Sequence, residues 1–467
     1  MQQYGGGVPV PEKSTETNMK ELESHFFDDE PKVSDFPVRQ DFIWNDDLRN
    51  AWQALVSAEP CVFVSGAAGT GKSTLLRLFL EETEGVLCAA STAIAALQVY
   101  GSTIHAMFRL PITLCYQYVL GNAQDQKFDQ IREAEYLVLD EASMIRADVM
   151  DAVNEMCKRA RGSYEPFGGL KVRLFGDCFQ LPPVLTNDEK NDWNANFSYE
   201  SPYFFDASVI RFDVQMKVCM LNLVYRQSDP EFIRLLHRVR QGAPTVEDLY
   251  LLNQKVGLVP DVDAVVLCPT NKKADEINQG MLDQIQAPEH TFVARVTGEF
   301  PKSMFPISET IKLKAGARIM FRRNDSEYDG GRQFVNGDVG EITRIGKDNT
   351  DNWRKNWVWV KLDRTGREIK VSFLTWEKKQ LVGKKLETVG AFQQIPVVLG
   401  WAISCHKSQG VSLDKMHLAS SAMFAPHQMY VSLSRLRTFD GLSLSREIVR
   451  KSIWVDPRVV KFYRDFT

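Results

Sequence analysis

One stretch of the chain has the residue types and the spacing of a phosphate-binding loop. It runs Gly66-Ala67-Ala68-Gly69-Thr70-Gly71-Lys72-Ser73 and matches G-x-x-x-x-G-K-[ST] in full. The glycines let the backbone curl so that its N–H groups surround phosphates, and the N-terminus of the following helix adds positive potential. We expect Lys72 to reach the terminal phosphates and the Ser73 hydroxyl to hold Mg²⁺. The loop predicts nucleotide binding but not the reaction, because kinases, GTPases, transporters and motors share it.

A pair of adjacent carboxylates indicates that the nucleotide is hydrolysed. Asp140 and Glu141 follow the apolar run 136–139, and an Asp at the end of such a strand can hold Mg²⁺ through its water shell. Glu141 can orient and deprotonate the attacking water, which a simple kinase does not need. Further on, the carboxamide of Gln180 can sense the terminal phosphate. The alternative for the two carboxylates is an acidic pair that only caps the next helix. The alternative for Gln180 is a structural turn fixed by Pro182 and Pro183.

Two arginines could supply the cation that meets the charge developing on a transferred phosphoryl group. Arg226 lies in the Tyr-Arg-Gln stretch 225–227, and Arg435 ends the stretch 428–435. If two α/β domains enclose the nucleotide, one arginine could come from each side. Taken alone, each arginine is about as typical of a surface salt bridge as of a phosphate contact. The residues by themselves therefore leave both interpretations open.

These side chains need a scaffold of short buried strands and covering helices. From about 45 to 240, apolar runs alternate with helical stretches, which is typical of a parallel sheet covered on both faces. The expected strands are 61–65, 86–90, 136–139 and 172–175, and the expected helices are 74–82 and 93–100. This pattern predicts one α/β domain over residues 41–240.

A second α/β unit is expected downstream, and a region with a different sequence pattern interrupts it. Its predicted strands are 265–268, 397–405 and 416–419, and its predicted helices are 272–281 and 428–435. In between lie the strand-like runs 317–321, 340–344, 357–362 and 368–373, separated by Asn-Gly, Asp-Gly and Gly-Lys turns. Strand-like runs separated by such turns predict a small antiparallel barrel. The expected division is 241–309 and 391–467 for the second α/β domain and 310–390 for the barrel.

The composition excludes several classes of protein. Hydrophobic residues make up 44% and charged residues 25% of the 467 residues, which argues against a disordered, collagen-like or coiled-coil protein. The longest apolar run, 395–403, is too short to cross a bilayer, and the N-terminus lacks the pattern of a secretory signal. The eight cysteines form no C-x-x-C pair, so we expect buried, reduced thiols in a cytoplasmic protein.

The charge balance neither requires nor excludes nucleic acid. A net charge of −4 argues mildly against it, although binding needs only a local basic groove. Residues 1–40 hold eight acidic and four basic residues and therefore account for the acidic excess. They predict a disordered acidic tail, with a partner-binding segment around Phe26-Phe27 or Phe36 as the alternative.

Taken in chain order, the short motifs resemble those of superfamily-one DNA helicases. More narrowly, the chain resembles the petite-integration-frequency (Pif) family of 5′-to-3′ helicases over about residues 45–450. The motifs are Gly66–Ser73, Ser91–Ala93, Ser102–His105, Asp140-Glu141, Gly176–Pro183, Tyr225–Gln227, His406–Gly410 and Tyr430–Arg435. The stretches that narrow the resemblance are Ser143–Arg161, Phe334–Gly340 and Trp401–Gly410.

The resemblance implies an α/β fold with two RecA-like P-loop NTPase domains and ATP between them. It also implies a small wedge insertion at about 106–131 and an inserted Src-homology-like β-barrel. The implied catalytic residues are Lys72, Glu141, Gln180, Arg226 and Arg435. ATP would contact Gly66, Ala67, Ala68, Gly69, Thr70, Gly71, Lys72, Ser73, Thr74, Gln180, Arg226, Gly410 and Arg435, and Mg²⁺ would contact Ser73 and Asp140. The residues implied to line a DNA channel are Thr92, Thr103, His105, Thr270, Asn271, Phe334, Asn336, His406, Lys407 and Ser408.

The function that the resemblance implies is ATP- and Mg²⁺-dependent translocation along single-stranded DNA in the 5′-to-3′ direction. The enzyme would act as a monomer at junctions or G-quadruplexes, in replication, repair, recombination or telomere maintenance. The alternatives are a RecD-like or Dda-like helicase, a DNA-stimulated ATPase that remodels nucleoprotein, and a P-loop kinase. Related helicases read adenine with a Gln shortly before the loop, where this chain has Leu48 or Arg49, with Gln40 and Gln53 as imperfect substitutes. Other nucleoside triphosphates could therefore serve.

Overall fold

The computed structural model describes residues 42–99, 101–111, 113–115, 128–325, 333–346, 356–382, 385–420 and 425–466. The chain divides into two units, Met1–Asn45 and Asp46–Thr467, and everything below concerns the second unit. The expected acidic tail, 1–40, lies outside the described residues, as does half of the expected wedge at 106–131.

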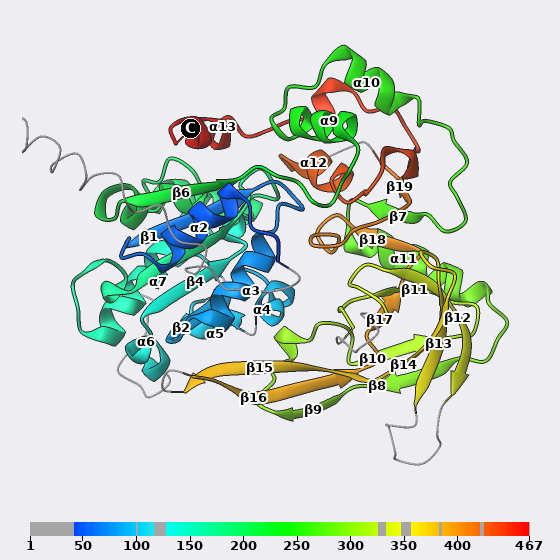
Figure 1. Cartoon of the computed structure of the whole chain (residues 1–467), viewed down its shortest axis with the longest axis horizontal. Helices are drawn as coiled ribbons and strands as arrows, with labels where there is room; N and C mark the ends of the chain where they lie inside the picture. Colours follow the sequence, from blue (N-terminus) through cyan, green and yellow to red (C-terminus); the bar gives the residue numbers. More distant parts are fainter. Residues whose placement is uncertain are drawn as a thin grey trace, which may run out of the picture. The chain divides into compact units, whose positions relative to one another are not determined.

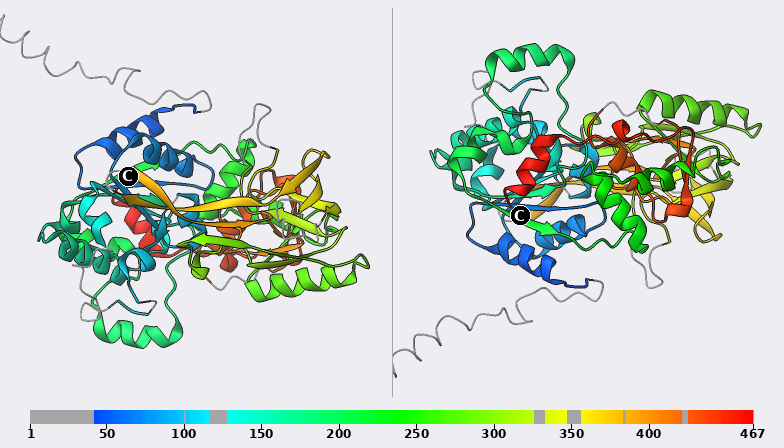
Figure 2. Two further views of the ribbon diagram at one scale, coloured as in Figure 1. Left: turned by 90° about the horizontal axis from the view of Figure 1, so that it is seen from below. Right: turned by 90° about the horizontal axis from the view of Figure 1, so that it is seen from above.

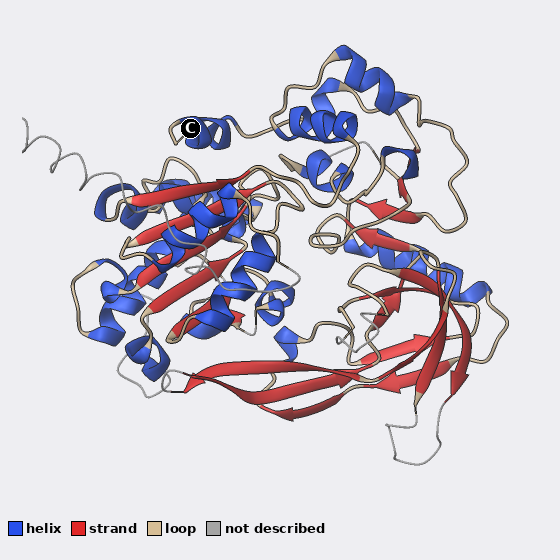
Figure 3. Cartoon of the chain, in the orientation of Figure 1, coloured by secondary structure: helices blue, strands red, loops and turns tan. Residues whose placement is uncertain are grey.

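The first sheet of this unit is parallel and carries the phosphate-binding loop (Figures 1 and 3). Its strands in spatial order are β3 (Ser102–Thr103), β2 (Val86–Ala90), β4 (Tyr136–Asp140), β5 (Lys171–Gly176), β1 (Cys61–Gly66) and β6 (Met216–Leu221). Every residue of β1 and β2 is buried, which explains why both were recognisable as uninterrupted apolar runs. β1 pairs in parallel with β5 and β6, so the loop leaves from the interior of the sheet.

The helices of this first lobe pack around the sheet and complete one large apolar core. Within the described residues they are α2 (Asp46–Val56), α3 (Lys72–Glu82), α4 (Ala93–Gln98), α5 (Ile104–Phe108), α6 (Asp129–Glu133), α7 (Ala147–Arg161) and α8 (Asn187–Asn196). The core joins Phe63 and Leu174 of the sheet to Val153 of α7. It also takes in Val459 and Phe462 of the last helix, α13 (Pro457–Arg464).

A second parallel sheet forms the second lobe and confirms the predicted α/β fold class. Its strands in spatial order are β18 (Ala402–Ser404), β7 (Val265–Cys268), β19 (Met416–Leu418) and β20 (Leu442–Leu444). Its helices are α9 (Pro230–Arg240), α10 (Val246–Asn253), α11 (Asn271–Gln284) and α12 (Gln428–Leu433). The single strand predicted over 397–405 was wrong, because β17 (Val397–Leu399) belongs to another sheet and the chain changes sheets at Gly400. A Cβ on Gly400 would lie 2.5 Å from the backbone carbon of Ile319.

Antiparallel strands occupy the region between the parts of the second lobe. A five-stranded sheet has the order β14 (Glu368–Ser372), β13 (Trp357–Leu362), β12 (Val339–Gly346), β11 (Arg318–Phe321) and β17. Two smaller sheets pair β10 (Thr310–Leu313) with β8 (His290–Val293), and β15 (Leu374–Val382) with β16 (Lys385–Gln394) and β9 (Arg295–Gly298). Figure 2 shows β15 and β16 as a long extended pair, and β15 contacts α4 and α6 of the first lobe. The closed barrel and the domain bounds stay predictions.

The chain passes between the two lobes twice. The first crossing, residues 222–229, runs from β6 to α9. The second crossing runs from Ile453, in the core of the second lobe, to Val459, in the core of the first. It packs closely on the end of α9, because a Cβ on Gly242 would lie 2.9 Å from Cγ2 of Val455. The last helix therefore follows the second lobe in sequence but packs on the first.

The cysteine side chains and the length of the apolar helices bear on two expectations from the sequence. All eight cysteines are free and seven of them are buried, as expected for thiols that serve as small apolar side chains. In the part of the chain that the structure describes, the helices lack the combination of length and apolarity that spanning a membrane requires.

Candidate nucleotide site and nucleic-acid interface

The loop between β1 and α3 has a backbone that only glycines allow. Gly69 has a φ of +83° and Gly71 one of +93°, in the left-handed region that residues with a Cβ rarely adopt. A Cβ on Gly69 would also lie 2.5 Å from Cβ of Arg226, on the first crossing. Ser73 and Thr74, at the N-terminus of α3, are exposed. The loop is therefore tightly packed on one side, while the start of its helix is accessible to a ligand.

Lys72 is held close to its own loop. Its Nζ donates to Gly66 O at 2.7 Å and to Ala67 O at 2.9 Å. Burial lowers the pKa of Lys72, and the charges of Asp177 and Glu141 oppose this effect. The ammonium thus lies within electrostatic reach of the predicted catalytic carboxylate, where phosphate oxygens could replace the loop carbonyls as its acceptors.

The two adjacent carboxylates share a strained turn at the end of β4. Glu141 has a φ of +52°, which is uncommon for a residue other than glycine, and its N–H donates to Asp140 Oδ1 at 2.8 Å. Burial, followed by the charge of Glu141, raises the pKa of Asp140 to about 7. Burial also raises the pKa of Glu141, although Lys72 and Arg435 oppose it. A cation beside these carboxyls would offset the cost of ionising them.

This arrangement fits Mg²⁺ bound together with a nucleotide. Among the residues that the structure describes, no group of three or more His, Cys, Asp or Glu could hold a metal ion. Mg²⁺ is usually bound through one or two carboxylates together with substrate phosphates, rather than by an all-protein cage. Asp140 and the exposed Ser73 are the residues that would form such a partial set of ligands.

The raised pKa of Asp140 leads to a prediction about stability. We expect Asp140→Asn to raise the melting temperature of the nucleotide-free protein, and to raise it more at about pH 8 than at about pH 6. The folded pKa of about 7 lies above the value of about 3.9 for an unfolded chain. Stability is therefore lost as the pH rises through the folded pKa, because the folded state must then carry an unfavourable buried charge.

Thermal unfolding at the two pH values measures the effect. Asp46→Asn is the control, because the Asp46 side chain is 95% exposed. An equal change in melting temperature at both pH values in Asp140→Asn would contradict the assignment.

The predicted sensor Gln180 adjoins an ion pair that sequence reasoning missed. Asp177 is completely buried and pairs with Arg240 at 2.8 Å, while Gln180 Nε2 donates to Asp177 Oδ2 at 3.4 Å. Burial opposes the ionisation of Asp177, but the charges of Arg240 and Lys72 outweigh it and hold its pKa below the usual value. Since Arg240 ends α9, this pair joins the two lobes beside the loop.

The two predicted arginine fingers converge on one residue of the second lobe. Arg226 Nη1 donates to Ser434 O at 3.0 Å, and Arg435 Nη2 donates to Ser434 Oγ at 2.8 Å. Burial, followed by the charge of Arg435, lowers the pKa of Arg226 to about 9. Two like charges in a buried place are costly unless an anion joins them. Their convergence therefore favours an anionic ligand at this point.

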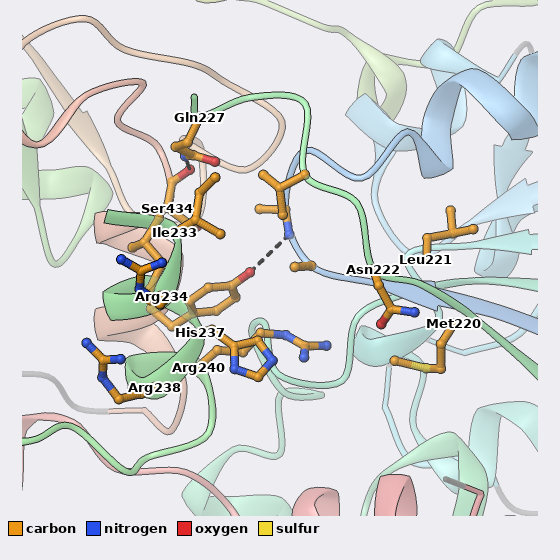
Figure 4. Close-up of a pocket in the computed structure, with 15 residues that line it drawn as sticks. Met220, Leu221, Asn222, Gln227, Ile233, Arg234, His237, Arg238, Arg240 and Ser434 are labelled. Carbon is orange, nitrogen blue, oxygen red and sulfur yellow. Dashed lines mark hydrogen bonds between the residues drawn. The ribbon is translucent and has the colours of Figure 1, made fainter. Parts of the chain in front are cut away.

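A cavity of about 290 Å³ lies between the loop, the first crossing and α9 (Figure 4). Tyr430 of α12 reaches into it, and its hydroxyl accepts a hydrogen bond from Ala68 N at 3.0 Å. Gln227 and Arg240 also line it. The cavity adjoins the phosphate site rather than forming it, because its lining does not include Lys72, Ser73, Asp140 or Glu141.

Leu48 and Tyr225 lie beside the loop where an adenine-reading side chain is expected. A Cβ on Gly71 would lie 3.9 Å from Cε2 of Tyr225 and 4.0 Å from Cδ2 of Leu48. The Tyr225 N–H also donates to Gly69 O at 2.8 Å, which holds the first crossing against the loop. Next to the loop, the chain thus presents the half-exposed aromatic ring of Tyr225, while Leu48 is buried at the loop's far end.

In the first lobe, the residues predicted to contact DNA lie at helix starts. Thr92 and Thr103 cap α4 and α5, where their hydroxyls accept from Ala95 N at 3.2 Å and Ala106 N at 3.3 Å. His105, in the first turn of α5, is half-buried, and this burial lowers its pKa. Helix N-termini are suited to phosphate contacts that carry no base specificity.

In the second lobe, the predicted DNA contacts share one edge of the sheet. β7 and β18 are parallel neighbours, and Thr270 and Asn271 follow the first while His406 and Lys407 follow the second. Ser404 Oγ donates to Asn271 Oδ1 at 2.6 Å and ties the two segments together. Thr270, Asn271 and Lys407 are exposed, and burial lowers the pKa of His406. The structure therefore brings these four residues together.

The other predicted contacts are less accessible. Ser408 is completely buried, and its hydroxyl donates to Cys405 O at 2.7 Å. Phe334 is 4% exposed and stacks on Phe321 with ring centroids 4.0 Å apart. Asn336 is half-buried, whereas Gly410 is exposed with a φ of +74°. The DNA contacts of Ser408, Phe334 and Asn336 and the nucleotide contact of Gly410 stay predictions.

Comparison with known proteins places the chain among helicases. A family profile described as PIF1-like helicase matches residues 46–248. The ATP-dependent DNA helicase Pif1 of Bdellovibrio bacteriovorus is 33% identical over 417 residues, which cover 87% of this chain and 88% of that protein. The human ATP-dependent DNA helicase PIF1 is 30% identical over 427 residues, which cover 86% of this chain but only 60% of the human protein.

A solved structure is similar over nearly the whole chain. Bacteroides sp Pif1 in complex with ADP-AlF4 has a TM-score of 0.81 and 31% sequence identity, and the match covers 91% of this chain and 97% of that one. The two α/β lobes are thus the RecA-like domains that the sequence predicts. From these matches, together with the loop, the paired carboxylates and the converging arginines, the chain belongs to the family of PIF1-like helicases.

Proposed function

We propose that this protein is an ATP-dependent DNA helicase that moves 5′ to 3′ along single-stranded DNA and opens the duplex ahead of it. One observation carries the proposal. Around a single loop, the structure gathers a phosphate cradle, two carboxylates with raised pKa values and two converging arginines. The relatives' names, which call them ATP-dependent DNA helicases, support the same activity.

The chain's own residues can carry the hydrolysis. Glu141 accepts a proton from the attacking water, a task that its raised pKa favours. Lys72, Arg226 and Arg435 stabilise the charge that develops on the transferred phosphoryl group. Mg²⁺, held by Asp140 and the Ser73 hydroxyl, would supply further neutralisation of the phosphate charge when bound.

Movement along DNA follows from the division of the site between the lobes. The loop and both carboxylates belong to the first lobe, whereas Arg435 and its partner Ser434 belong to the second. Binding of ATP therefore draws the lobes together, and hydrolysis releases them. Exposed groups of both lobes, among them Lys407, would hold phosphates of a single strand by contacts that are independent of sequence. We propose junctions and G-quadruplexes as the structured substrates and a monomer as the working form.

The first experiment compares two partial duplexes, one with a 5′ single-stranded tail and one with a 3′ tail, with and without ATP and Mg²⁺. We expect ATP-dependent opening of the 5′-tailed duplex alone. Lys72→Ala is the control, because it removes a main phosphate contact and should abolish both hydrolysis and opening. Opening of the 3′-tailed duplex alone would reject the polarity. DNA-stimulated hydrolysis without opening would favour a protein that remodels nucleoprotein.

Base selectivity should be weak. Tyr225, which is 49% exposed beside the loop, offers an aromatic surface, and an aromatic ring stacks on any base. We expect kcat/KM for GTP to lie within about tenfold of that for ATP. Steady-state hydrolysis of the two nucleotides in the presence of single-stranded DNA measures this ratio. A preference for ATP of more than about a thousandfold would require a hydrogen-bonding contact to adenine.

A further inference from the structure

The last helix brings an unexpected side chain to the nucleotide site. α13 follows the second lobe in sequence but packs in the core of the first lobe, where the ring of Phe462 stacks on Phe205 with centroids 4.3 Å apart. These apolar contacts are sufficient to explain why the helix docks. They do not explain the polar atom that its next residue, Tyr463, buries beside them.

The Tyr463 hydroxyl joins the two loops of the phosphate site. It lies 2.6 Å from Ser65 Oγ, and it accepts a hydrogen bond from Cys178 N at 3.0 Å. Ser65 immediately precedes the phosphate-binding loop, whereas Cys178 lies between Asp177 and the sensor Gln180. The two segments follow the neighbouring strands β1 and β5, in which Ser65 is paired with Gly176. A single hydroxyl therefore fixes the spacing between the end of one strand and the loop that follows the other.

The Tyr463 ring reinforces the same loop. It stacks on Phe179 with centroids 4.9 Å apart and an interplanar angle of 11°. Arg240, which pairs with Asp177, lies 4.3 Å above the Phe179 ring and 5.7 Å from the Tyr463 ring. The loop 177–180 is thus held by side chains from α9, the first helix of the second lobe, and from α13, which follows that lobe in the sequence.

We propose that Tyr463 is a positioning residue for ATP hydrolysis. Its hydroxyl keeps the loop 177–180 in register with the phosphate-binding loop, so that Gln180 meets the terminal phosphate when the lobes close. The inference rests on the proposed ATPase activity. Packing alone would be satisfied by phenylalanine, which would avoid the cost of burying a hydroxyl. We therefore attribute the value of the hydroxyl to its bonds with the Ser65 hydroxyl and the Cys178 N–H.

Tyr463→Phe tests the proposal because it keeps the ring and removes only the hydroxyl. We expect kcat for DNA-stimulated ATP hydrolysis to fall about tenfold while KM for ATP stays within about twofold. The matched control is Tyr199→Phe, which removes another tyrosine hydroxyl of the same lobe, bound to Asp151 Oδ2 at 2.8 Å. It should lower the melting temperature by a similar amount and leave kcat unchanged.

A second variant tests the same contact from its other partner, and its own fall in kcat decides the question if Tyr463→Phe folds poorly. Ser65→Ala removes one partner of the hydroxyl, and we expect a smaller fall in kcat that does not add to the effect of Tyr463→Phe in the double variant. An unchanged kcat in both variants, equal losses of kcat in Tyr463→Phe and Tyr199→Phe, or a rise in KM with kcat intact would each overturn the proposal. If the wild-type protein hydrolyses no ATP, the proposed function fails before this question arises.

Discussion

Glu141→Gln is expected to bind ATP and single-stranded DNA but to lower kcat for hydrolysis by about 10²- to 10⁴-fold. The carboxamide cannot accept the proton that the attacking water must lose. The variant keeps the shape of the side chain and removes the charge that burial disfavours. We therefore expect binding to be unchanged or tighter. Phosphate release at saturating DNA measures turnover, and a fluorescent nucleotide measures binding.

The matched control for this prediction lies at the other end of the same strand. Glu135 immediately precedes β4, and its side chain is 57% exposed and paired with Lys171. Glu135→Gln should leave both kcat and nucleotide binding unchanged. Hydrolysis at the wild-type rate in Glu141→Gln would move the general base elsewhere. Loss of nucleotide binding would instead indicate that the carboxylate has a structural role.

Arg240→Met should be the most destabilising of the substitutions considered, with a loss of about 3–5 kcal/mol in the free energy of unfolding. Asp177 is completely buried, and removal of Arg240 takes away its ion-pair partner, so that only the charge of Lys72 still opposes the cost of its burial. The aromatic faces of Phe179 and Tyr463 lose the guanidinium at the same time. Denaturation by urea, followed for the wild-type protein and the variant, measures the change.

A double-mutant cycle separates the ion pair from the packing. Asp177→Asn combined with Arg240→Met should recover much of the lost stability, because no charge then remains buried without a partner. Arg234→Met is the control on the same helix, since Arg234 and its partner Glu231 are 58% and 81% exposed and exposed pairs contribute about 0–1 kcal/mol. Additive losses in the double variant would show that the pair is not the source of the effect.

Local patterns predicted the elements whose burial is uniform. The run predicted as strand 86–90 coincides with β2, and the predicted strand 61–65 differs from β1 by one residue. The helix predicted from residue 74 begins at Lys72, because the loop's final turn is already helical. The strand predicted over 397–405 was wrong because apolar residues in two different sheets form one apolar run in the sequence.

The parts of the site that were missed depend on contacts between distant residues. The ion pair of Asp177 with Arg240 spans 63 positions, and the bond between Ser65 and Tyr463 spans 398. No periodicity or short motif carries such a pairing, and an arginine in the last turn of a helix is ordinary on its own. The loop, the carboxylates and the two predicted arginine fingers could be named from the sequence because each is a compact motif or follows from the resemblance.

The two crossings have a mechanical consequence. Two bodies joined by one flexible segment can rotate about many axes, whereas two separate attachments leave mainly the line between them as a hinge. The segment 222–229 and the five-residue interval between Ile453 and Val459 are such attachments. Opening and closing of the lobes would then follow a single arc, and each cycle of hydrolysis would repeat a stroke of the same direction. A motor that must advance one way along a strand needs this restriction of its degrees of freedom as much as it needs the energy of ATP.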